Sequence, residues 1–477
     1  MPQNRRIYLL DPKKLSPETI AVTFAKTSRS PQAFDVIAEE LSDKRSADFH
    51  EKWVVGYGHS SVAEHAVLHI AIENVSRLAI ESLESNRLAS YTEKSSRYQI
   101  WDADHFYIPA EFEDERLNAL FLQTCTDLFE AYQQAYTVIY QSLIGTTPRK
   151  KGESERGFQT RVRSSSADVC RYFLPAASLA NVGISINARA LEHAITKLLS
   201  HPLQEVQAIG AEIKSNALKH VPTLVKYANP NPHLIALNRD TFSPIQFADK
   251  NRQAEGDWCS CIDCDQYGED KILAALIYRT EHISMQQAMN IVASMDAKEK
   301  KDLFTKYSVL LGEHDQPARE FEYATATFDL VLDQGAYFEL KRHRMMTQTV
   351  QAFTPYLGFA IPKLIATNGL SDLFIYKMHQ ALEAYEVLAQ SDENAAAYVL
   401  PNAYNRRVLL HMNLRSAIHL ITLRCAENAH FAIRRPTLRI AEILRERYPL
   451  LGELLSPCSN ENWQGVEQDY FAETHMV

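Results

Sequence analysis

The sequence predicts an α+β fold that the chain uses twice. Short runs in both halves alternate apolar and polar residues, as half-buried strands do, and the clearest are Val67–Ile72 and Tyr323–Val331. Longer stretches place apolar residues three and four positions apart, which is typical of helices that pack against a core. These stretches cover residues 117–143, 190–221, 370–390 and 416–448.

A repeated motif indicates that the two halves are copies of one unit. Leu174-Pro175 followed by Asn187-Ala188-Arg189 recurs as Leu400-Pro401 followed by Asn413-Leu414-Arg415, with the same internal spacing. In each half the motif then runs into a predicted helix. We therefore expect a first copy at residues 1–227, a linker or insertion at 228–270 that is rich in Asn, Pro, Asp and Gly, and a second copy at 271–477.

Composition excludes some classes of partner. With 477 residues, of which 46% are hydrophobic and 23% charged, the chain is typical of globular proteins and long enough for two domains. Its net charge of −9 argues against binding to nucleic acid or to an acidic membrane surface. We find neither a membrane-spanning run nor the apolar core of a secretory signal. Seven mostly scattered cysteines fit a reducing compartment, so we expect a cytoplasmic protein.

The one cysteine group is Cys259, Cys261 and Cys264, within the predicted linker. Three thiolates together with an Asp, or with a ligand from a partner chain, could hold zinc. Zinc sites usually bring a second pair of ligands at a longer spacing, and none lies nearby. We therefore favour a loop with free thiols and predict no metal site.

Two polar segments carry the candidate chemistry. In the second half, Arg342-His343-Arg344 ends an apolar run, and such cationic clusters typically meet phosphate or another anion, although a solvated helix end gives the same pattern. The equivalent run in the first half ends in Ser85-Asn86-Arg87, which keeps only the last arginine. Ser95-Ser96-Arg97 follows and offers hydroxyls, N–H groups and a guanidinium, which suit a phosphate; a capped surface turn is the alternative.

Residues His59 to Tyr98 resemble the flavin-dependent thymidylate synthases, whose motif reads Arg-His-Arg, two residues, Ser, four residues, Ser, one residue, Arg. The likeness extends through both halves. It implies two tandem copies of that family's fold, a mixed sheet with long helices. It also implies FAD-dependent methylation of dUMP to dTMP, with methylenetetrahydrofolate and NADPH as co-substrates. Members of the family are homotetramers, so two fused copies imply a homodimer that forms a pseudo-tetramer.

Neither copy has the whole motif, and the losses are complementary. The first copy keeps Glu93, Ser95 and Arg97 but lacks Arg-His-Arg, whereas the second keeps Arg-His-Arg and lacks the rest. The resemblance therefore implies one composite site and one dismantled twin. For substrate binding it implies Glu93, Lys94, Ser95, Ser96, Arg97, Arg171, Glu339, Arg342 and Arg424. For cofactor binding it implies His59, Ser61, Glu93, Arg342, His343, Arg344, Asn413, Arg415 and His419.

Arg424 is also the expected catalytic residue, because a guanidinium there would stabilise a deprotonated pyrimidine N3. One departure from the family bears on the substrate: Glu339 stands where the family has a base-reading glutamine. A carboxylate accepts hydrogen bonds but does not donate them, so either another pyrimidine nucleotide is the substrate or Glu339 pairs with an arginine and never touches the base. A non-catalytic nucleotide- or flavin-binding protein is the remaining alternative.

Overall fold

The computed structural model describes residues 6–27, 30–41, 46, 49, 60–97, 99–102, 105–238, 256–312 and 315–475. The chain divides into two compact units. Unit 1 comprises residues 1–95, 105–118 and 177–246, and unit 2 comprises residues 96–104, 119–176 and 247–477.

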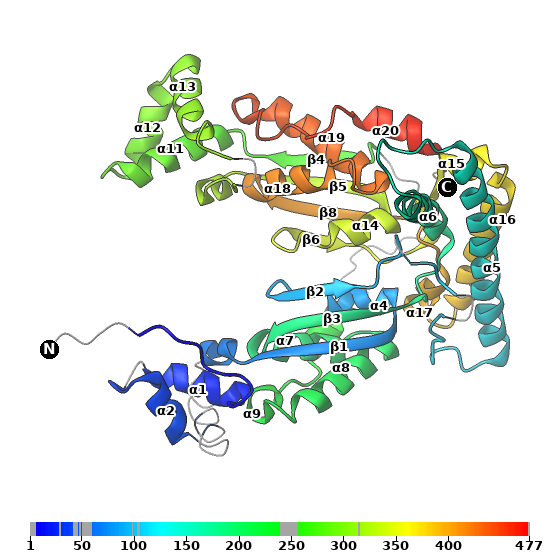
Figure 1. Ribbon diagram of the computed structural model, residues 1–477, viewed down its shortest axis with the longest axis horizontal. Coiled ribbons are helices and arrows are strands. Elements are labelled where there is room, and N and C mark those ends of the chain that lie inside the picture. The colour runs from blue at the N-terminus through cyan, green and yellow to red at the C-terminus, as the bar shows by residue number, and fades with distance from the viewer. Residues whose placement is uncertain are drawn as a thin grey trace. The chain divides into compact units, whose positions relative to one another are not determined.

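Unit 1 is built on a three-stranded antiparallel sheet of order β1-β3-β2. Its strands are β1 (Val67–Ser76), β2 (Ala89–Glu93) and β3 (Leu179–Asn187). Helices α4 (Arg77–Leu83), α7 (Ala188–Leu199) and α8 (Gln204–Ala217) pack together beside this sheet (Figure 1). The other elements are α1 (Pro17–Thr27), α2 (Phe34–Glu40), the 3₁₀ helix η2 (Ser60–His65), α9 (Pro222–Val225) and α10 (Pro232–Leu237).

Unit 2 contains a four-stranded antiparallel sheet of order β4-β5-β8-β6 and a two-stranded sheet of β7 and β9. Helices α18 (Leu414–Arg424) and α19 (Phe431–Arg447) cover one face of the larger sheet (Figure 1). The strands are β4 (Cys259–Cys264), β5 (Thr325–Asp333), β6 (Thr347–Val350), β7 (Phe359–Pro362), β8 (Asn405–Asn413) and β9 (Phe471–His475). The shorter α-helices are α11 (Gly268–Thr280), α12 (Met285–Ser294), α13 (Ala297–Ser308), α14 (Gln334–Leu340), α15 (Lys363–Thr367), α17 (Glu393–Ala396) and α20 (Trp463–Tyr470). The 3₁₀ helices are η3 (Arg171–Phe173), η5 (Arg319–Tyr323), η6 (Pro355–Leu357), η7 (Ala397–Val399) and η8 (Pro449–Leu451).

The strand order of unit 1 recurs in unit 2, as the repeated sequence motif predicts. Strands β5, β8 and β6 pair in the order of β1, β3 and β2, and β8 continues into α18 as β3 continues into α7. The same side chain begins both helices. Asn187 Oδ1 accepts from the Ala190 N–H, and Asn413 Oδ1 accepts from the Ser416 N–H, each at 2.8 Å.

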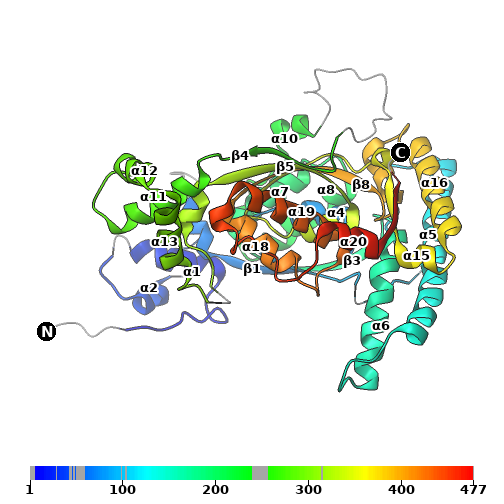
Figure 2. The ribbon, with the colours of Figure 1, turned by 90° about the horizontal axis from the view of Figure 1, so that it is seen from above.

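Part of the first copy lies in unit 2. Helices α5 (Glu115–Thr146) and α6 (Glu155–Cys170) belong to it almost entirely, and α5 runs beside α16 (Ser371–Leu388) in both ribbon views (Figure 2). Asp127 on α5 forms an ion pair of 3.2 Å with Lys377 on α16. As a consequence, Arg97 and Arg171 of the first copy share a unit with the Arg-His-Arg triplet of the second.

Several sequence predictions need correction. The stretch 190–221 is two helices, because Pro202 lies in the break between α7 and α8, and 416–448 is also two, with the break after Arg424. The predicted mixed sheet is wrong, since every strand pair in the described chain is antiparallel. An alternating pattern identifies a half-buried strand without giving the direction of its neighbour.

The cysteine segment is not a loop. Cys259 to Cys264 form strand β4, which pairs with β5, and all seven cysteines of the chain are thiols without a disulfide. The described residues contain no cluster of three His, Cys, Asp or Glu side chains that could hold a metal. None of the described helices is long and apolar enough to cross a membrane.

Candidate active site

The Arg-His-Arg triplet lies in a tight turn after α14. The helix is fully buried and ends at Leu340, where the Lys341 N–H still donates to the Tyr337 carbonyl. In the turn the His343 side chain points into the protein and is 7% exposed, whereas Arg342 is exposed and Arg344 is half-buried. The turn therefore presents cationic side chains on either side of a buried imidazole.

Arg424 joins this turn from the end of α18. Its Nη1 donates to Glu339 Oε2 at 2.6 Å, and its Nε donates to His343 Nε2 at 3.0 Å. The Glu339 and Arg424 side chains are only 8% and 17% exposed. Since His343 Nε2 accepts this bond, the imidazole carries its proton on Nδ1. The Arg424 side chain thus bridges a carboxylate and a neutral histidine.

Glu339 is surrounded by arginines from both copies. Burial alone would raise the pKa of its carboxyl, but the positive charges of Arg171, Arg424, Arg342 and Arg97 together lower it. Arg97 and Arg171 come from the first copy and Arg342 and Arg424 from the second. The Glu339 carboxylate therefore lies among four guanidinium groups, one of which also pairs with Asp168, and the remaining positive charge attracts a further anion.

Arg97 is anchored by groups that sequence reasoning did not identify. Its Nε and Nη2 donate to the two carboxylate oxygens of Asp168 at 2.8 and 3.1 Å, and Nη2 also donates to the Asn428 carbonyl at 3.2 Å. His430 Nε2 donates to the Asp168 carbonyl at 3.0 Å, because its Nδ1 accepts from the Ala432 N–H. Nothing local in the sequence indicates the contacts of Asp168 with Arg97 and His430, which join positions 71 and 262 residues apart.

Arg171 is more deeply buried than Arg97, at 2% exposed. Its Nη2 donates to the Gly335 carbonyl at 3.2 Å, and its own carbonyl accepts from Asn402 Nδ2 at 2.9 Å. A Cβ on Gly335 would lie 3.1 Å from Arg171 Nη2, so glycine at this position lets the guanidinium reach the start of α14. Ser96, beside Arg97, is also buried, at 4% exposed.

Of the residues predicted to bind the cofactor in unit 2, His419 packs against His343. Burial, reinforced by Arg424 and His419, lowers the pKa of His343 to about 3, so its ring is neutral at physiological pH. The His343 and His419 rings meet edge to face with centroids 5.7 Å apart. Arg415 donates to Glu322 Oε1 at 3.1 Å and to the Pro317 carbonyl at 2.8 Å.

Asn413 is the cap residue that precedes α18. Its side-chain oxygen is therefore used by the Ser416 N–H.

The remaining predicted residues belong to unit 1 or lie outside the described residues, as His59 does. Ser61 is exposed in η2. Glu93 forms a buried ion pair of 2.9 Å with Arg77, with side chains 1% and 3% exposed. The Lys94 N–H donates to the Asn181 carbonyl at 2.9 Å. Ser95 is the last residue of this first segment of unit 1.

Unit 1 holds the counterpart of the Arg424 contact in a weakened form. Lys197, at the place of Arg424, donates to Asn86 Oδ1 at 3.2 Å and also bonds the Ser85 hydroxyl. Asn86 stands where the second copy has His343. Burial lowers the pKa of Lys197 to about 8. In unit 1, a lysine therefore still donates to a neutral side-chain acceptor, but serine at position 82 stands in place of the Glu339 carboxylate.

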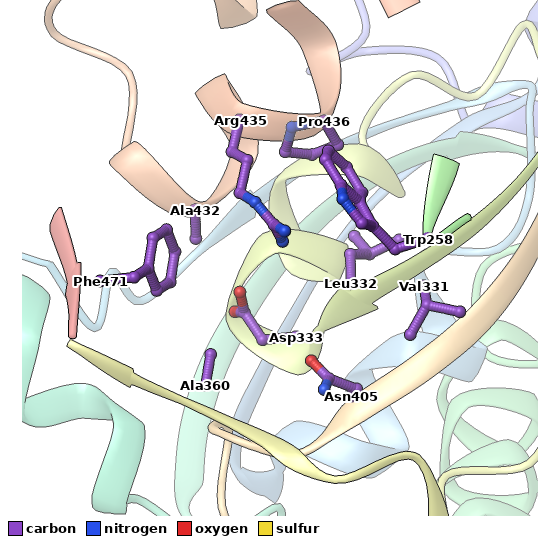
Figure 3. Close-up of a pocket in the computed structure, with 10 residues that line it drawn as sticks. All are labelled: Trp258, Val331, Leu332, Asp333, Ala360, Asn405, Ala432, Arg435, Pro436 and Phe471. Carbon is purple, nitrogen blue, oxygen red and sulfur yellow. The ribbon is translucent and has the colours of Figure 1, made fainter. Parts of the chain in front are cut away.

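A separate pocket in unit 2 lies at the start of α14 (Figure 3). Asp333 and Arg435 face it, and the Arg435 guanidinium stacks over Trp258 at 3.8 Å while its Nε donates to Glu467. Burial raises the pKa of Asp333 to about 6, although its hydrogen bond from the Ala336 N–H and the nearby arginines oppose the shift. The sequence carries no motif for this pocket.

Comparison with known proteins identifies the family. A family model described as thymidylate synthase complementing protein matches residues 10–223 and 266–450. A UPF0159 protein of Chlamydia muridarum is 29% identical over 443 residues, which cover 87% of this chain and 82% of that protein. A flavin-dependent thymidylate synthase of Sulfolobus acidocaldarius is 31% identical over 218 residues, which cover 45% of this chain and 73% of that enzyme.

Among solved structures, the flavin-dependent thymidylate synthase of Helicobacter pylori complexed with FAD and dUMP is 20% identical, and the match covers 45% of this chain and 96% of that one with a TM-score of 0.31. The family model spans most of both copies. The chain therefore belongs to the family of thymidylate synthase complementing proteins.

Proposed function

We propose that the chain is a flavin-dependent methyltransferase that converts dUMP to dTMP, with FAD as cofactor and methylenetetrahydrofolate and NADPH as co-substrates. Membership of the family and the flavin-dependent thymidylate synthases among the relatives support this activity. The observation that carries the proposal is the arginine cluster of unit 2, which combines Arg97 and Arg171 of the first copy with Arg342 and Arg424 of the second around Glu339.

In this proposal the nucleotide phosphate binds to the first-copy arginines. Arg97 and Arg171 are held by protein groups at defined orientations, and Ser96 and Arg342 complete the phosphate site. Guanidinium groups bind phosphate through strong charge-assisted hydrogen bonds, and anchoring them beforehand reduces the entropy lost on binding. Lys94 and Ser95 of unit 1 are the further phosphate ligands that we expect.

The pyrimidine base is then the group that meets Arg424. A guanidinium beside N3 favours the deprotonated base, which raises electron density at C5, and no protein nucleophile is needed. His343 orients Arg424 by accepting from its Nε. Because the imidazole is neutral, it does this without adding a positive charge of its own.

The residues around His343 fit a flavin. A neutral imidazole that presents Nδ1–H, the neighbouring His419 ring and the Arg344 guanidinium are donors suited to the carbonyl oxygens of an isoalloxazine ring and to a diphosphate. We propose that these three residues hold FAD together with Arg415 and Asn413, and that His59, Ser61 and Glu93 contribute from the other copy. When bound, FAD supplies the hydride-transfer chemistry. We further propose that the active assembly is a homodimer.

Glu339 leaves a second candidate substrate to be tested. Its ion pair with Arg424 at 2.6 Å fits a carboxylate that never touches the base, but it also puts a negative charge next to the guanidinium. A carboxylate beside the guanidinium opposes a negative charge on uracil N3. A cytosine nucleotide offers an amino donor to Glu339 next to a ring-nitrogen acceptor for Arg424, and it needs no such charge. Glu339 therefore makes dCMP the alternative to dUMP.

The experiment that tests the proposal is a titration of the purified protein with FAD, followed by its visible spectrum before and after dUMP is added. We expect a bound-flavin spectrum that changes on addition of dUMP, and formation of dTMP when methylenetetrahydrofolate and NADPH are present. The same titration with dCMP compares the two bases. A protein that takes up no FAD would contradict the proposal and would favour a non-catalytic nucleotide-binding role.

A further inference from the structure

Strand β4 brings two cysteine side chains to the same face of the sheet. A regular strand would direct them to opposite faces. Residues three apart in a regular strand point to opposite faces of a sheet. In β4, however, Cys261 lies opposite Phe328 and Cys264 lies opposite Ala326, and the pairing shifts register between them. Ile262 is the extra residue of this bulge and is 61% exposed. Since Phe328 and Ala326 are two residues apart on β5, both cysteines face the same side of the sheet.

The two cysteines are close enough for a bond. Two residues of a strand span about 6.6 Å, which lies within the range of about 4.4 to 6.8 Å between Cα atoms joined by a disulfide. Burial together with the charge and hydrogen bond of Cys264 raises the pKa of the Cys261 thiol to about 12, which marks the two thiols as direct neighbours.

Access differs among the three thiols of the strand. Cys259 is 1% exposed, whereas Cys261 and Cys264 are half-buried. A solvent-open pocket beside Cys261 is flanked by Arg439 and Arg447 of α19. The charges of this pocket are mixed, because Asp257 and Glu446 also line it and Arg439 pairs with Glu442 at 2.6 Å. Arg447 is the guanidinium whose charge acts on the Cys261 thiol.

We propose that Cys261 and Cys264 form a reversible intramolecular disulfide, with a small anionic disulfide such as oxidised glutathione as the oxidant. One cysteine sulfur attacks the glutathione disulfide and releases one reduced glutathione. The second cysteine sulfur then displaces the other glutathione from the mixed disulfide. The new sulfur–sulfur bond takes the place of the old one, and the two thiol protons leave with the two glutathione molecules.

The surroundings also set the rate of the exchange. The thiolate is the attacking form, and the raised pKa of Cys261 keeps it scarce at neutral pH. With Cys261 as the attacking sulfur, disulfide formation is therefore slow near pH 7 and speeds up about tenfold for each pH unit through pH 9. An exposed cysteine outside the strand, Cys458, reports the reagent's own reactivity, because the thiol near it, Cys425, is buried.

The test uses the full chain incubated with oxidised glutathione at pH 7, 8 and 9, followed by alkylation of the remaining thiols and mass spectrometry. We expect Cys261 and Cys264 to be protected from alkylation. The peptide that contains β4 should then be lighter by two hydrogen atoms than the same peptide with two free thiols. Reduced glutathione in excess restores alkylation of both cysteines. At Cys458 we expect a glutathione adduct instead. The measurement needs no variant, so it does not depend on how a substituted chain folds.

Three variants assign the pair. Cys261→Ser and Cys264→Ser each leave one sulfur without its partner, so the other should retain a glutathione adduct rather than form a disulfide. Cys259→Ser, the matched control on the same strand, should leave the disulfide unchanged. The proposal is overturned if Cys458 reacts while Cys261 and Cys264 stay reduced, if each carries a separate glutathione, or if the disulfide involves Cys259.

Discussion

Replacement of Glu339 by glutamine tests whether the Glu339 carboxylate opposes a negative charge on the pyrimidine base. The Glu339 carboxylate lies 2.6 Å from Arg424 Nη1 and is 8% exposed, so its charge acts on a base that Arg424 binds. Two like charges about 4 Å apart repel by about 4 kcal/mol at an effective dielectric constant of about 20. A uracil deprotonated at N3 would suffer this repulsion, and glutamine removes it while keeping a hydrogen-bond acceptor for Arg424.

We therefore expect Glu339→Gln to raise kcat/KM for dUMP by up to about a thousandfold, since about 1.4 kcal/mol corresponds to a factor of ten. The assay measures dTMP formation and the dUMP-induced change in the flavin spectrum, with dCMP as the competing ligand. Binding of dCMP should weaken in the same variant. Glu467→Gln is the matched control, because Glu467 pairs with Arg435 at 3.0 Å on the same unit but outside the arginine cluster. If Glu339→Gln changes dUMP turnover no more than the control does, Glu339 does not act on the base.

The other predictions concern charge at the site and in the core. Arg97→Ala should weaken dUMP binding by about ten- to a hundredfold, because a hydrogen bond to a charged group contributes about 1.5–3 kcal/mol, whereas Arg87→Ala should have little effect; equal losses in a calorimetric titration would refute the asymmetric site. Asp333 has a pKa of about 6 in the folded chain against an ordinary value of 3.8, so the folded chain binds the proton more tightly. Its contribution to stability is present below about pH 4 and is lost as pH rises through 6. In denaturant titrations the wild type should therefore lose about 3 kcal/mol relative to Asp333→Asn between pH 4 and 7, and parallel curves would contradict this. Arg77→Ala should cost about 3–5 kcal/mol of unfolding free energy, because it removes the cation of a buried ion pair and leaves the Glu93 charge buried. Arg77→Met combined with Glu93→Gln should recover most of that loss, and a cost below about 1 kcal/mol for the single change would show that the pair contributes little.

Local patterns in the sequence were sufficient for much of the fold. Alternation identified β1 and β5, and helical spacing identified α5 and α16 with boundaries within two or three residues. The equal spacing of Asn187 and Asn413 predicted the repeat, because both positions do the same job of capping the helix that follows. These features depend on neighbours along the chain, which periodicity and composition report directly.

Apolar spacing along the sequence did not reveal the break between α18 and α19. Apolar spacing continues across the gap between α18 and α19, and His430, which caps α19, is not a residue that usually marks a helix start. The bulge in β4 was missed as well, since only pairing with β5 reveals that Ile262 is an extra residue.

The sequence by itself determined which side chains each copy retains, from Arg97 and Arg171 in the first to Arg342 and Arg424 in the second. Only the tertiary structure decided what those charges meet. The pairing of Arg424 with Glu339 and that of Arg97 with Asp168 join positions 85 and 71 residues apart. A buried guanidinium must find a carboxylate or a carbonyl, but packing selects which one, and no local pattern encodes that choice.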